Sequence, residues 1–258
     1  YKNLYPQADL VLSPARCIIN EFRSYLGMNI SNYMLLHNPV DVQKIKSTEH
    51  LLPEASEQRK RTRHFVCAGR LHPQKGFDRL IEALASRKGQ NWTLDILGEG
   101  KERENLETLI AKHGLENQIT LKGLVTKPWP LIAQADAFLL PSRWEGLPNV
   151  ALESLCAGTP VIAHAEAGGI QEIADLADKG SVEVVTDMQK MLDLMDTVIP
   201  NPARSFRTSL LPEYFSLQSV TARFSNILEG KNIERPPVRR RREIVYTPHR
   251  RSFGRRAA

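Results

Sequence analysis

The chain has 258 residues, of which 41% are hydrophobic and 25% are charged. These proportions are ordinary for a soluble globular protein, and the length allows one or two domains with a sizeable core. No apolar run approaches the roughly 18–20 residues that a bilayer-spanning helix needs, and the first residues lack the apolar segment of a signal peptide. Composition therefore excludes a transmembrane helix and favours a folded, soluble chain.

The formal net charge of +6 comes from the C-terminus. Residues 231–258 contain ten Lys and Arg against two Glu, so the rest of the chain is slightly acidic. With so few apolar residues this segment cannot bury enough surface to fold, and we expect a basic disordered tail. A solvated extension and an arm for nucleic acid or an anionic membrane surface both remain open, although only Tyr246 and Phe253 offer rings that could stack on bases.

The three cysteines, Cys17, Cys67 and Cys156, are odd in number and match no metal-binding or disulfide spacing. Cys67 and Cys156 lie in apolar stretches, and no plausible base stands beside any of the three. We therefore expect reduced, unreactive thiols in a cytoplasmic protein, with membrane association through the tail as an open possibility.

The first 62 residues alternate less regularly than the rest. Residues 8–12 predict a strand, Ser13 and Pro14 a turn, and residues 17–26 an amphipathic helix. Residues 35–41 predict another strand and turn. Residues 42–62 are polar and predict a linker.

Between Arg63 and Asp187 apolar strands alternate with helices. The spacing of apolar residues at i, i+3, i+4 and i+7 predicts a helix over residues 77–84. Strands are predicted at residues 64–68, 92–97, 119–121, 137–140, 160–163 and 181–185, and helices at 77–84, 102–113, 129–135, 150–157, 170–173 and, further on, 215–228. Such alternation is typical of an α/β fold, a Rossmann-like doubly wound parallel sheet covered on both faces.

Ligands of open parallel sheets bind beyond the carboxyl ends of the strands, which here points to the loops after the predicted strands. The first such loop carries Gly69 and Arg70, and Lys75 opens the next helix. A glycine lets the backbone approach a ligand, the Arg fork suits a phosphate, and Lys adds a point charge. An exposed basic turn without a ligand is the alternative.

The loop after residues 137–140 carries the stronger motif. It reads Glu145-Gly146-Leu147-Pro148-Asn149-Val150 and is followed by Glu153. Proline in the first turn and glycine before it predict a helix N-terminus whose N–H groups favour a phosphate. Glu153, further into the helix, could accept hydrogen bonds from ribose hydroxyls, and Glu145 could face a sugar. Plain surface charge is the alternative.

These motifs resemble the C-terminal domain of the retaining GT-B glycosyltransferases of family 4, also called glycosyl transferases group 1. The resemblance covers residues 36–187. The matching stretches are Asn38-Pro39-Val40-Asp41, Gly69-Arg70-Leu71 with Lys75-Gly76, Ile96-Leu97-Gly98-Glu99-Gly100, Leu121-Lys122-Gly123, Pro141-Ser142 with Glu145-Gly146, Glu153, and Gly158-Thr159-Pro160-Val161-Ile162-Ala163 with Gly168-Gly169.

The resemblance implies transfer of a hexose from a UDP-, GDP- or ADP-linked sugar to a glycan or lipid, with retention, no cofactor and no required metal. Arg70 and Lys75 would bind the diphosphate, with Gly69 beside it, and Glu145 would contact the sugar; these three charged residues are the catalytic candidates. Glu153 would bind the ribose. The backbone of residues 146–150 would meet the distal phosphate or the sugar, and Gly123 and Leu124 would border the base.

The resemblance also implies a domain plan. Residues 1–37 correspond to a remnant of the N-terminal GT-B domain, residues 38–205 to the nucleotide-sugar-binding domain, residues 206–230 to a helix that crosses back, and residues 231–258 to the tail. Because the family places its acceptor site in the N-terminal domain, we do not expect this chain alone to be a competent transferase. His37, His72 and His164 are expected to be loop or packing residues.

Three other functions remain open from the sequence. A non-catalytic module that binds nucleotide sugars would use the same residues. A nucleotide-sugar epimerase of the GT-B type is disfavoured by Glu145-Gly146-Leu147-Pro148, which matches the transferase motif closely. A nucleic-acid-binding protein would depend on the tail.

Overall fold

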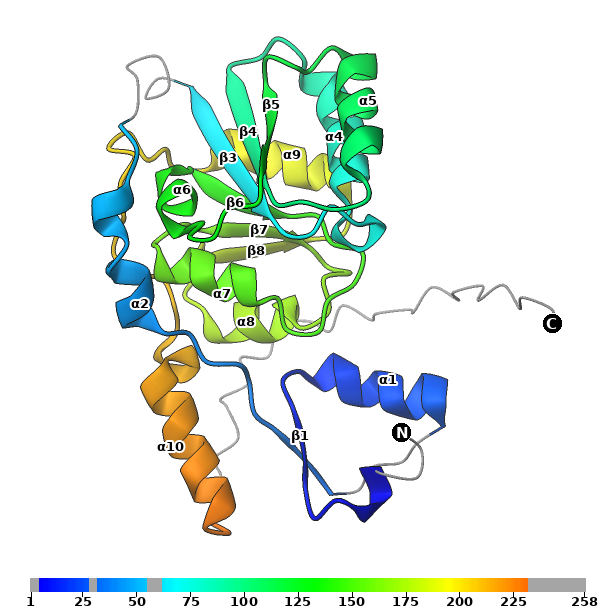
Figure 1. Ribbon diagram of the computed structural model, residues 1–258, viewed down its shortest axis with the longest axis vertical. Helices are drawn as coiled ribbons and strands as arrows, with labels where there is room; N and C mark the ends of the chain where they lie inside the picture. Colours follow the sequence, from blue (N-terminus) through cyan, green and yellow to red (C-terminus); the bar gives the residue numbers. More distant parts are fainter. Residues whose placement is uncertain (1–4, 28–31, 55–61, 232–258) are drawn as a thin grey trace, which may run out of the picture.

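The structure, a computed structural model, describes residues 5–27, 32–54 and 62–231 (Figure 1). It contains a two-stranded parallel sheet, β1-β2, and a six-stranded sheet in the order β5-β4-β3-β6-β7-β8. Helices cover both faces of the larger sheet, so the predicted α/β doubly wound fold is confirmed. Apart from Lys231, the basic tail lies outside the described residues.

The six strands of the larger sheet are all parallel and mostly buried. Every residue of β6 and β7 is buried, as continuous apolar runs require when helices pack on both faces. The strands are β3 (Arg63–Ala68), β4 (Trp92–Leu97), β5 (Ile119–Gly123), β6 (Ala137–Leu140), β7 (Val161–His164) and β8 (Val182–Val185).

One face of the sheet is covered by three helices, α4 (Phe77–Leu84), α5 (Arg103–His113) and α9 (Met188–Thr197). In α4 the residues at the predicted apolar positions, Phe77, Leu80, Ile81 and Leu84, are all buried. The opposite face carries four helices, α2 (Val42–Lys46), α6 (Trp129–Gln134), α7 (Asn149–Cys156) and α8 (Ile170–Leu176). Figure 1 shows the two helix layers on either side of the strands.

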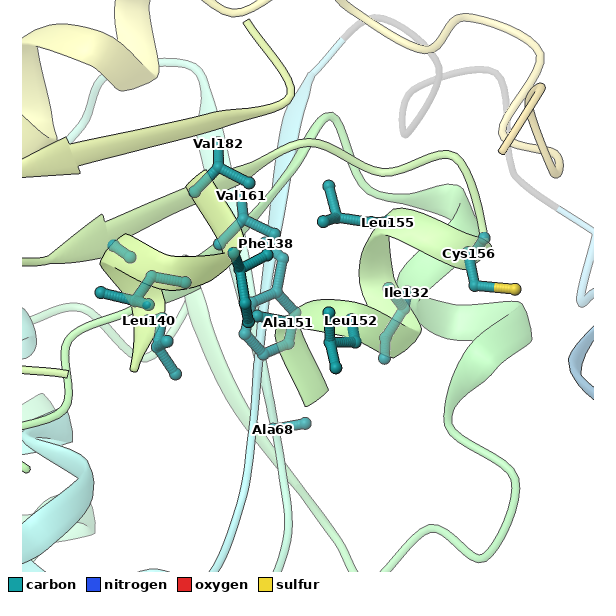
Figure 2. Close-up of a cluster of buried hydrophobic side chains, with 14 of the residues drawn as sticks. Ala68, Ile132, Phe138, Leu140, Ala151, Leu152, Leu155, Cys156, Val161 and Val182 are labelled. Atoms are coloured by element: carbon teal, nitrogen blue, oxygen red, sulfur yellow. The ribbon is translucent and has the colours of Figure 1, made fainter. Parts of the chain in front are cut away.

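The core beneath α7 fixes the position of that helix on the sheet. Figure 2 shows Phe138 and Leu140 of β6 next to Ala151 and Leu152 of α7, all buried in one cluster. Burying side chains of this size contributes roughly 1.5–3 kcal/mol each. The N-terminus of α7 is therefore held by packing along the body of the helix.

The N-terminal residues form a separate strand–helix–strand unit of β1 (Val11–Ser13), α1 (Arg16–Leu26) and β2 (Tyr33–Leu35). Residues 215–217, at the start of the last described helix, pair with the backbone just after this unit. Val40 donates its N–H to the carbonyl of Phe215 over 2.8 Å and accepts the N–H of Leu217 over 3.0 Å. α10 (Leu217–Leu228) follows, with Phe224 and Leu228 exposed.

The structure corrects two sequence predictions and adds a helix that was not predicted. Residues 42–62 were expected to be a linker, but 42–46 form α2, because Asp41 caps the helix by accepting the Lys44 N–H over 2.9 Å. The helix α9 was not predicted. The first strand begins at Val11 and not at residue 8. None of the helices in the described residues is long and apolar enough to cross a membrane.

The strand order reverses between β3 and β6. From β3 the sheet continues through β4 to β5 on one side, and from β6 through β7 to β8 on the other. Loops leave the carboxyl ends of β3 and β6 in opposite directions, and the crevice between them is where ligands of such sheets bind.

Candidate active site

The loops after β3 and β6 meet at an ion pair. Lys75 Nζ lies 2.7 Å from Glu145 Oε1, and the buried hydroxyl of Ser142 donates to the same oxygen over 2.7 Å. The side-chain amide of Gln74 approaches Glu145 Oε2 at 3.5 Å. The Glu145 side chain is only 9% exposed. The structure thus places a carboxylate with three donors at the strand-order reversal.

A tight turn brings Lys75 to this position. Residues Pro73–Lys75 form a short 3-10 helix, which His72 caps by accepting the Gln74 N–H over 3.2 Å. Gly76 then adopts φ +66°, and a Cβ there would lie 2.0 Å from the carbonyl oxygen of Pro141. A glycine is therefore what allows the Lys75 turn to rest against the start of the β6–α7 loop.

Arg79 clamps the same loop from α4. Its Nε donates to the carbonyl of Pro141 and its Nη2 to the carbonyl of Ser142, both over 2.8 Å. Its Nη1 lies 2.6 Å from Glu166, in the loop after β7. One guanidinium therefore ties together the loops after β6 and β7.

A second clamp lies nearer the surface. Arg143 makes a two-pronged ion pair with Asp78, with both distances 2.7 Å. Its N–H donates to the Gln74 carbonyl over 2.8 Å, and Gln74 in turn donates to the Trp144 carbonyl over 2.9 Å. The loop that carries Glu145 is thus bound to residues 73–79 along much of its length.

The N-terminus of α7 follows directly. Pro148 stands at the N-cap and no side chain caps the helix, so its first N–H groups keep the partial positive charge of a helix N-terminus. Leu147 and Pro148 are buried, whereas Asn149 is exposed and accepts a hydrogen bond from Asn38 over 2.9 Å. The predicted phosphate-binding backbone of residues 146–150 is therefore next to the Lys75–Glu145 pair in sequence and space.

The loop after β7 supports the loop of Glu145 from its other side. Gly169 donates its N–H to the Gly146 carbonyl over 2.7 Å. Gly168 has φ +58°, and a Cβ there would stand 2.0 Å from the Glu145 carbonyl oxygen. Only a residue without a side chain permits this approach.

Arg70 is exposed immediately after β3 and Gly69. Within residues 5–27, 32–54 and 62–231, no hydrogen bond or ion pair engages its guanidinium. It is a permanent positive charge at the carboxyl end of β3, and its donors are available to an anion.

Glu153 lies apart from the ion pair, further along α7. Its Oε2 accepts the indole N–H of Trp129 over 2.8 Å. Burial raises the pKa of this carboxyl, while the Trp129 hydrogen bond and the charge of Lys44 act in the opposite direction. Glu153 lines a cavity of about 150 Å³ together with Trp129, Lys44 and Asn149.

Gly123 ends the edge strand β5, two strands from β3, and Leu124 follows it. Gly123 accepts the Gly98 N–H over 2.8 Å, and Leu124 is 76% exposed. The predicted base-bordering loop is therefore on the same edge of the sheet as the ion pair.

Helix α1 packs on the loop of Glu145. The Cys17 thiol approaches the Gly146 carbonyl at 3.6 Å, and burial raises its pKa to about 11, so it stays protonated and donates. A Cβ on Gly146 would lie 3.0 Å from Ile18. Arg16 donates its N–H to Glu172 over 2.7 Å.

The three histidines near the site have structural contacts. His37 is buried and lies 3.1 Å from Glu172. His72 caps the turn before Lys75, as described above. His164 is buried in β7, 3.1 Å from the Thr186 carbonyl and 3.3 Å from Glu166. Their positions agree with the expectation of loop and packing residues.

The match to a family model decides the assignment. Residues 50–210 match the model described as "Glycosyl transferases group 1". The chain belongs to this family. The matched region contains Lys75, Glu145, the N-terminus of α7 and both clamps.

Individual relatives agree. An uncharacterized glycosyltransferase of Methanocaldococcus jannaschii is 30% identical over 177 residues, 67% of this chain and 44% of the relative. The N-acetylgalactosamine-N,N'-diacetylbacillosaminyl-diphospho-undecaprenol 4-alpha-N-acetylgalactosaminyltransferase of Campylobacter jejuni is 27% identical over 198 residues, 76% of this chain and 52% of the relative. The chain spans about half the length of these curated relatives.

The fold is also that of solved glycosyltransferase structures. The Anabaena protein Alr3699/HepE in complex with UDP-glucose superposes with a TM-score of 0.69 at 20% identity, over 89% of this chain and 66% of that protein. The lipopolysaccharide outer core galactosyltransferase WaaB superposes with a TM-score of 0.65 at 22% identity, over 86% and 62% of the two chains. These similarities support the fold.

Sequence reasoning missed several residues of the site. Ser142, Gln74 and Arg79 orient Glu145 or its loop, and Trp129 binds Glu153. Ser142 stands in the recognised Pro141-Ser142 motif, which was a usable signal. Nothing local marks the other three, because their partners are distant in sequence.

Proposed function

We propose that this chain supplies the donor-binding half of a glycosyltransferase that moves a hexose from a nucleotide-diphosphate sugar to a glycan or lipid acceptor, with retention of configuration. The observation that carries the proposal is the convergence of Lys75, Glu145 and the uncapped N-terminus of α7 at the strand-order reversal. All three lie within the residues that match the family.

The charges fit the chemistry of glycosyl transfer. The sugar becomes oxocarbenium-like while negative charge develops on the departing diphosphate. Arg70, Lys75 and the α7 N-terminus would stabilise that charge, and electrostatic stabilisation of this kind is usually the largest single contribution to enzyme catalysis. Lys75 is paired with Glu145, so it would be shared between the sugar-facing carboxylate and the diphosphate of a bound donor.

The remaining predicted residues would contact the other parts of the donor. Glu145 would accept hydrogen bonds from sugar hydroxyls, and Glu153 from the ribose. Gly69 and the backbone of residues 146–150 would line the diphosphate, and Gly123 and Leu124 the base. Because Arg70 and Lys75 would neutralise the diphosphate, we propose that the reaction requires no metal or cofactor. Transfer should therefore continue in the presence of a chelator.

The relatives suggest the setting. The Campylobacter jejuni protein is named for transfer to a diphospho-undecaprenol-linked sugar, and another relative for lipopolysaccharide core biosynthesis. The Anabaena structure holds UDP-glucose. We propose UDP-linked sugars first among the UDP, GDP and ADP donors, a glycan or lipid acceptor, and a cytoplasmic location, with contact of the basic tail to a membrane surface.

We propose the same domain plan that the resemblance implies. Residues 38–205 bind the nucleotide sugar, residues 1–37 belong to the N-terminal domain, residues 206–230 cross back to it, and residues 231–258 form the tail. The hydrogen bonds that join Val40 to Phe215 and Leu217 support this plan, because they link the beginning of the proposed nucleotide-sugar-binding domain to the segment proposed to cross back.

Calorimetric titration with UDP, GDP and ADP tests the proposal. Micromolar binding of one of them is expected, and Arg70→Ala should weaken it by roughly 1.5–3 kcal/mol, the range for hydrogen bonds to charged groups. The affinity for the matching nucleoside should not change in Arg70→Ala, since the nucleoside lacks the diphosphate. Arg87→Ala is the control, because Arg87 pairs with Asp193 and Asp196 away from the candidate site.

Equal losses in the two arginine variants, or no binding of any nucleotide, would remove the donor-site assignment. If the donor binds, incubation with a lipid-linked acceptor and analysis of the product anomer test transfer and retention. If the donor binds but no sugar is transferred, even when an N-terminal acceptor domain is supplied, the chain is better described as a non-catalytic nucleotide-sugar-binding module. Conversion of the free nucleotide sugar into its epimer would instead indicate an epimerase.

A further inference from the structure

The second carboxylate of the site is held by an aromatic residue of another helix. Trp129, in the first turn of α6, donates its indole N–H to Glu153 Oε2 on α7 over 2.8 Å. Within the described residues Oε1 accepts no hydrogen bond. Both residues line the cavity of about 150 Å³ that also borders Asn149, in the first turn of α7.

The environment of Glu153 makes this bond consequential. The carboxyl is partly buried, and burial raises its pKa, which favours the protonated form. The Trp129 hydrogen bond is the larger of the two effects that lower it, and the charge of Lys44 is the other. An indole N–H can only donate a hydrogen bond. It therefore stabilises the ionised carboxylate, and it cannot accept a hydrogen bond from the O–H of a protonated carboxyl group.

The other charged or titratable groups near Glu153 are few. Lys44 of α2 lies across the cavity and 5.8 Å from the centre of the Trp129 ring. Asp41, the cap of α2, lines the same cavity, and Cys156 lies one turn along α7 and has a raised pKa mainly through burial. Trp129 is the neighbour that binds the carboxylate directly.

We propose that Trp129 is a positioning residue for nucleotide binding, which holds Glu153 oriented and ionised to accept the two hydroxyls of a ribose. This inference rests on the proposed function and deepens it. A vicinal diol presents two donors, and only an ionised carboxylate accepts both without supplying a proton of its own. With Oε2 bound to the indole, the rotamer of Glu153 is set before the nucleotide arrives.

The test compares two matched variants of the full 258-residue chain. Trp129→Phe removes the indole N–H and keeps an aromatic ring. Trp92→Phe makes the same change at the beginning of β4, where the indole donates to the Arg87 carbonyl over 2.8 Å, away from the site. Urea unfolding first establishes that each variant is folded.

Each protein is titrated with UDP and with 2',3'-dideoxy-UDP. In the unmodified chain and in Trp92→Phe, loss of the diol should weaken binding about tenfold or more, a difference of 1.4 kcal/mol or more. In Trp129→Phe this ratio should fall to about threefold or less, because UDP loses affinity and the dideoxy nucleotide does not. The pH below which UDP affinity falls should also move upward, which a purely structural role would not cause.

A ratio and a pH profile in Trp129→Phe equal to those of Trp92→Phe would overturn the inference and leave the donor site standing. So would the absence of any diol preference in the unmodified chain. If UDP does not bind the unmodified chain and neither GDP nor ADP replaces it, the proposed function fails and this inference with it. In Glu153→Gln, Trp129→Phe should have no further effect on the diol ratio.

Discussion

The two arginines that clamp the loop of Glu145 should contribute very differently to stability. Arg79 donates to two carbonyls, those of Pro141 and Ser142, and both residues are buried. Arg143 pairs with Asp78 at the surface, where the two side chains are 32% and 43% exposed. We predict that Arg79→Met destabilises the chain much more than Arg143→Met.

The magnitudes follow from what each change leaves behind. Arg79→Met leaves two buried carbonyls without their donor and removes the ion pair to the partly buried Glu166, and each unsatisfied buried group costs about 1–3 kcal/mol. Because water can reach part of this site, we expect about 3 kcal/mol in total. Arg143→Met removes an exposed ion pair, worth about 1 kcal/mol or less, and a hydrogen bond to the Pro73 carbonyl, which water can replace because Pro73 is exposed. Methionine preserves most of the apolar stem in both variants.

Urea unfolding followed by circular dichroism measures the difference, provided that the slope with denaturant is unchanged. The expected shift in the transition midpoint is about three times larger for Arg79→Met than for Arg143→Met. Equal shifts, or a larger one for Arg143→Met, would refute the reasoning that burial of the acceptors decides the value of the clamp. Both variants should also bind UDP more weakly, since each lacks an arginine that holds the loop between Ser142 and Glu145.

Two other predictions concern the same edge of the sheet. Gly168→Ala should lower the free energy of unfolding by at least about 1 kcal/mol more than Gly180→Ala, and it should also weaken UDP binding. Both glycines have positive φ, but of the two only Gly168 has a backbone atom, the Glu145 carbonyl oxygen, where a Cβ would stand. Equal unfolding curves for the two variants would contradict this. Burial raises the pKa of Glu153 above its ordinary value of 4.5, so the folded chain binds an extra proton above that pH and the free energy of unfolding falls as pH rises through this window. Glu153→Gln should remove this slope, so its stability relative to the unmodified chain should be higher at pH 7 than at pH 4, and the opposite order in urea unfolding would contradict the sign.

The sheet was predictable because its strands and helices carry strong periodicity. α4, β4 and β6 lie at their predicted bounds, since continuous apolar strands and a helix with apolar residues every three or four positions admit one interpretation each. α9 was missed although Asp187 caps it and Met191 and Met195 are buried. Only a short apolar stripe distinguishes it from a polar segment.

α2 was missed for a different reason. It has five residues and a single buried side chain, Ile45, so no periodicity can be read from it. Its one signal is local, the Asp41 cap. Helices this short are formed by capping and by the surface they rest on, and the surface is known only after the chain has folded.

The charged residues of the site were predictable one by one, but their pairing was not. Motifs marked Lys75 and Glu145 as separate ligand contacts, yet the two are 70 residues apart and meet only because β3 and β6 are neighbours in the sheet. The same holds for Trp129 and Glu153. The order of strands in the sheet depends on how the whole domain packs. Contacts between segments that this order brings together therefore cannot be predicted from local sequence patterns.

The three loops at this edge act as one unit. Gly76 lets the loop after β3 touch Pro141, and Gly168 lets the loop after β7 touch Glu145, so the loop after β6 is held between them on both sides. Arg79 joins the loops after β6 and β7, because it extends from α4 to the Pro141 and Ser142 carbonyls and on to Glu166. A displacement of any one loop must therefore move the Glu145 carboxylate. That coupling explains why residues with no contact to a nucleotide sugar should still change its binding.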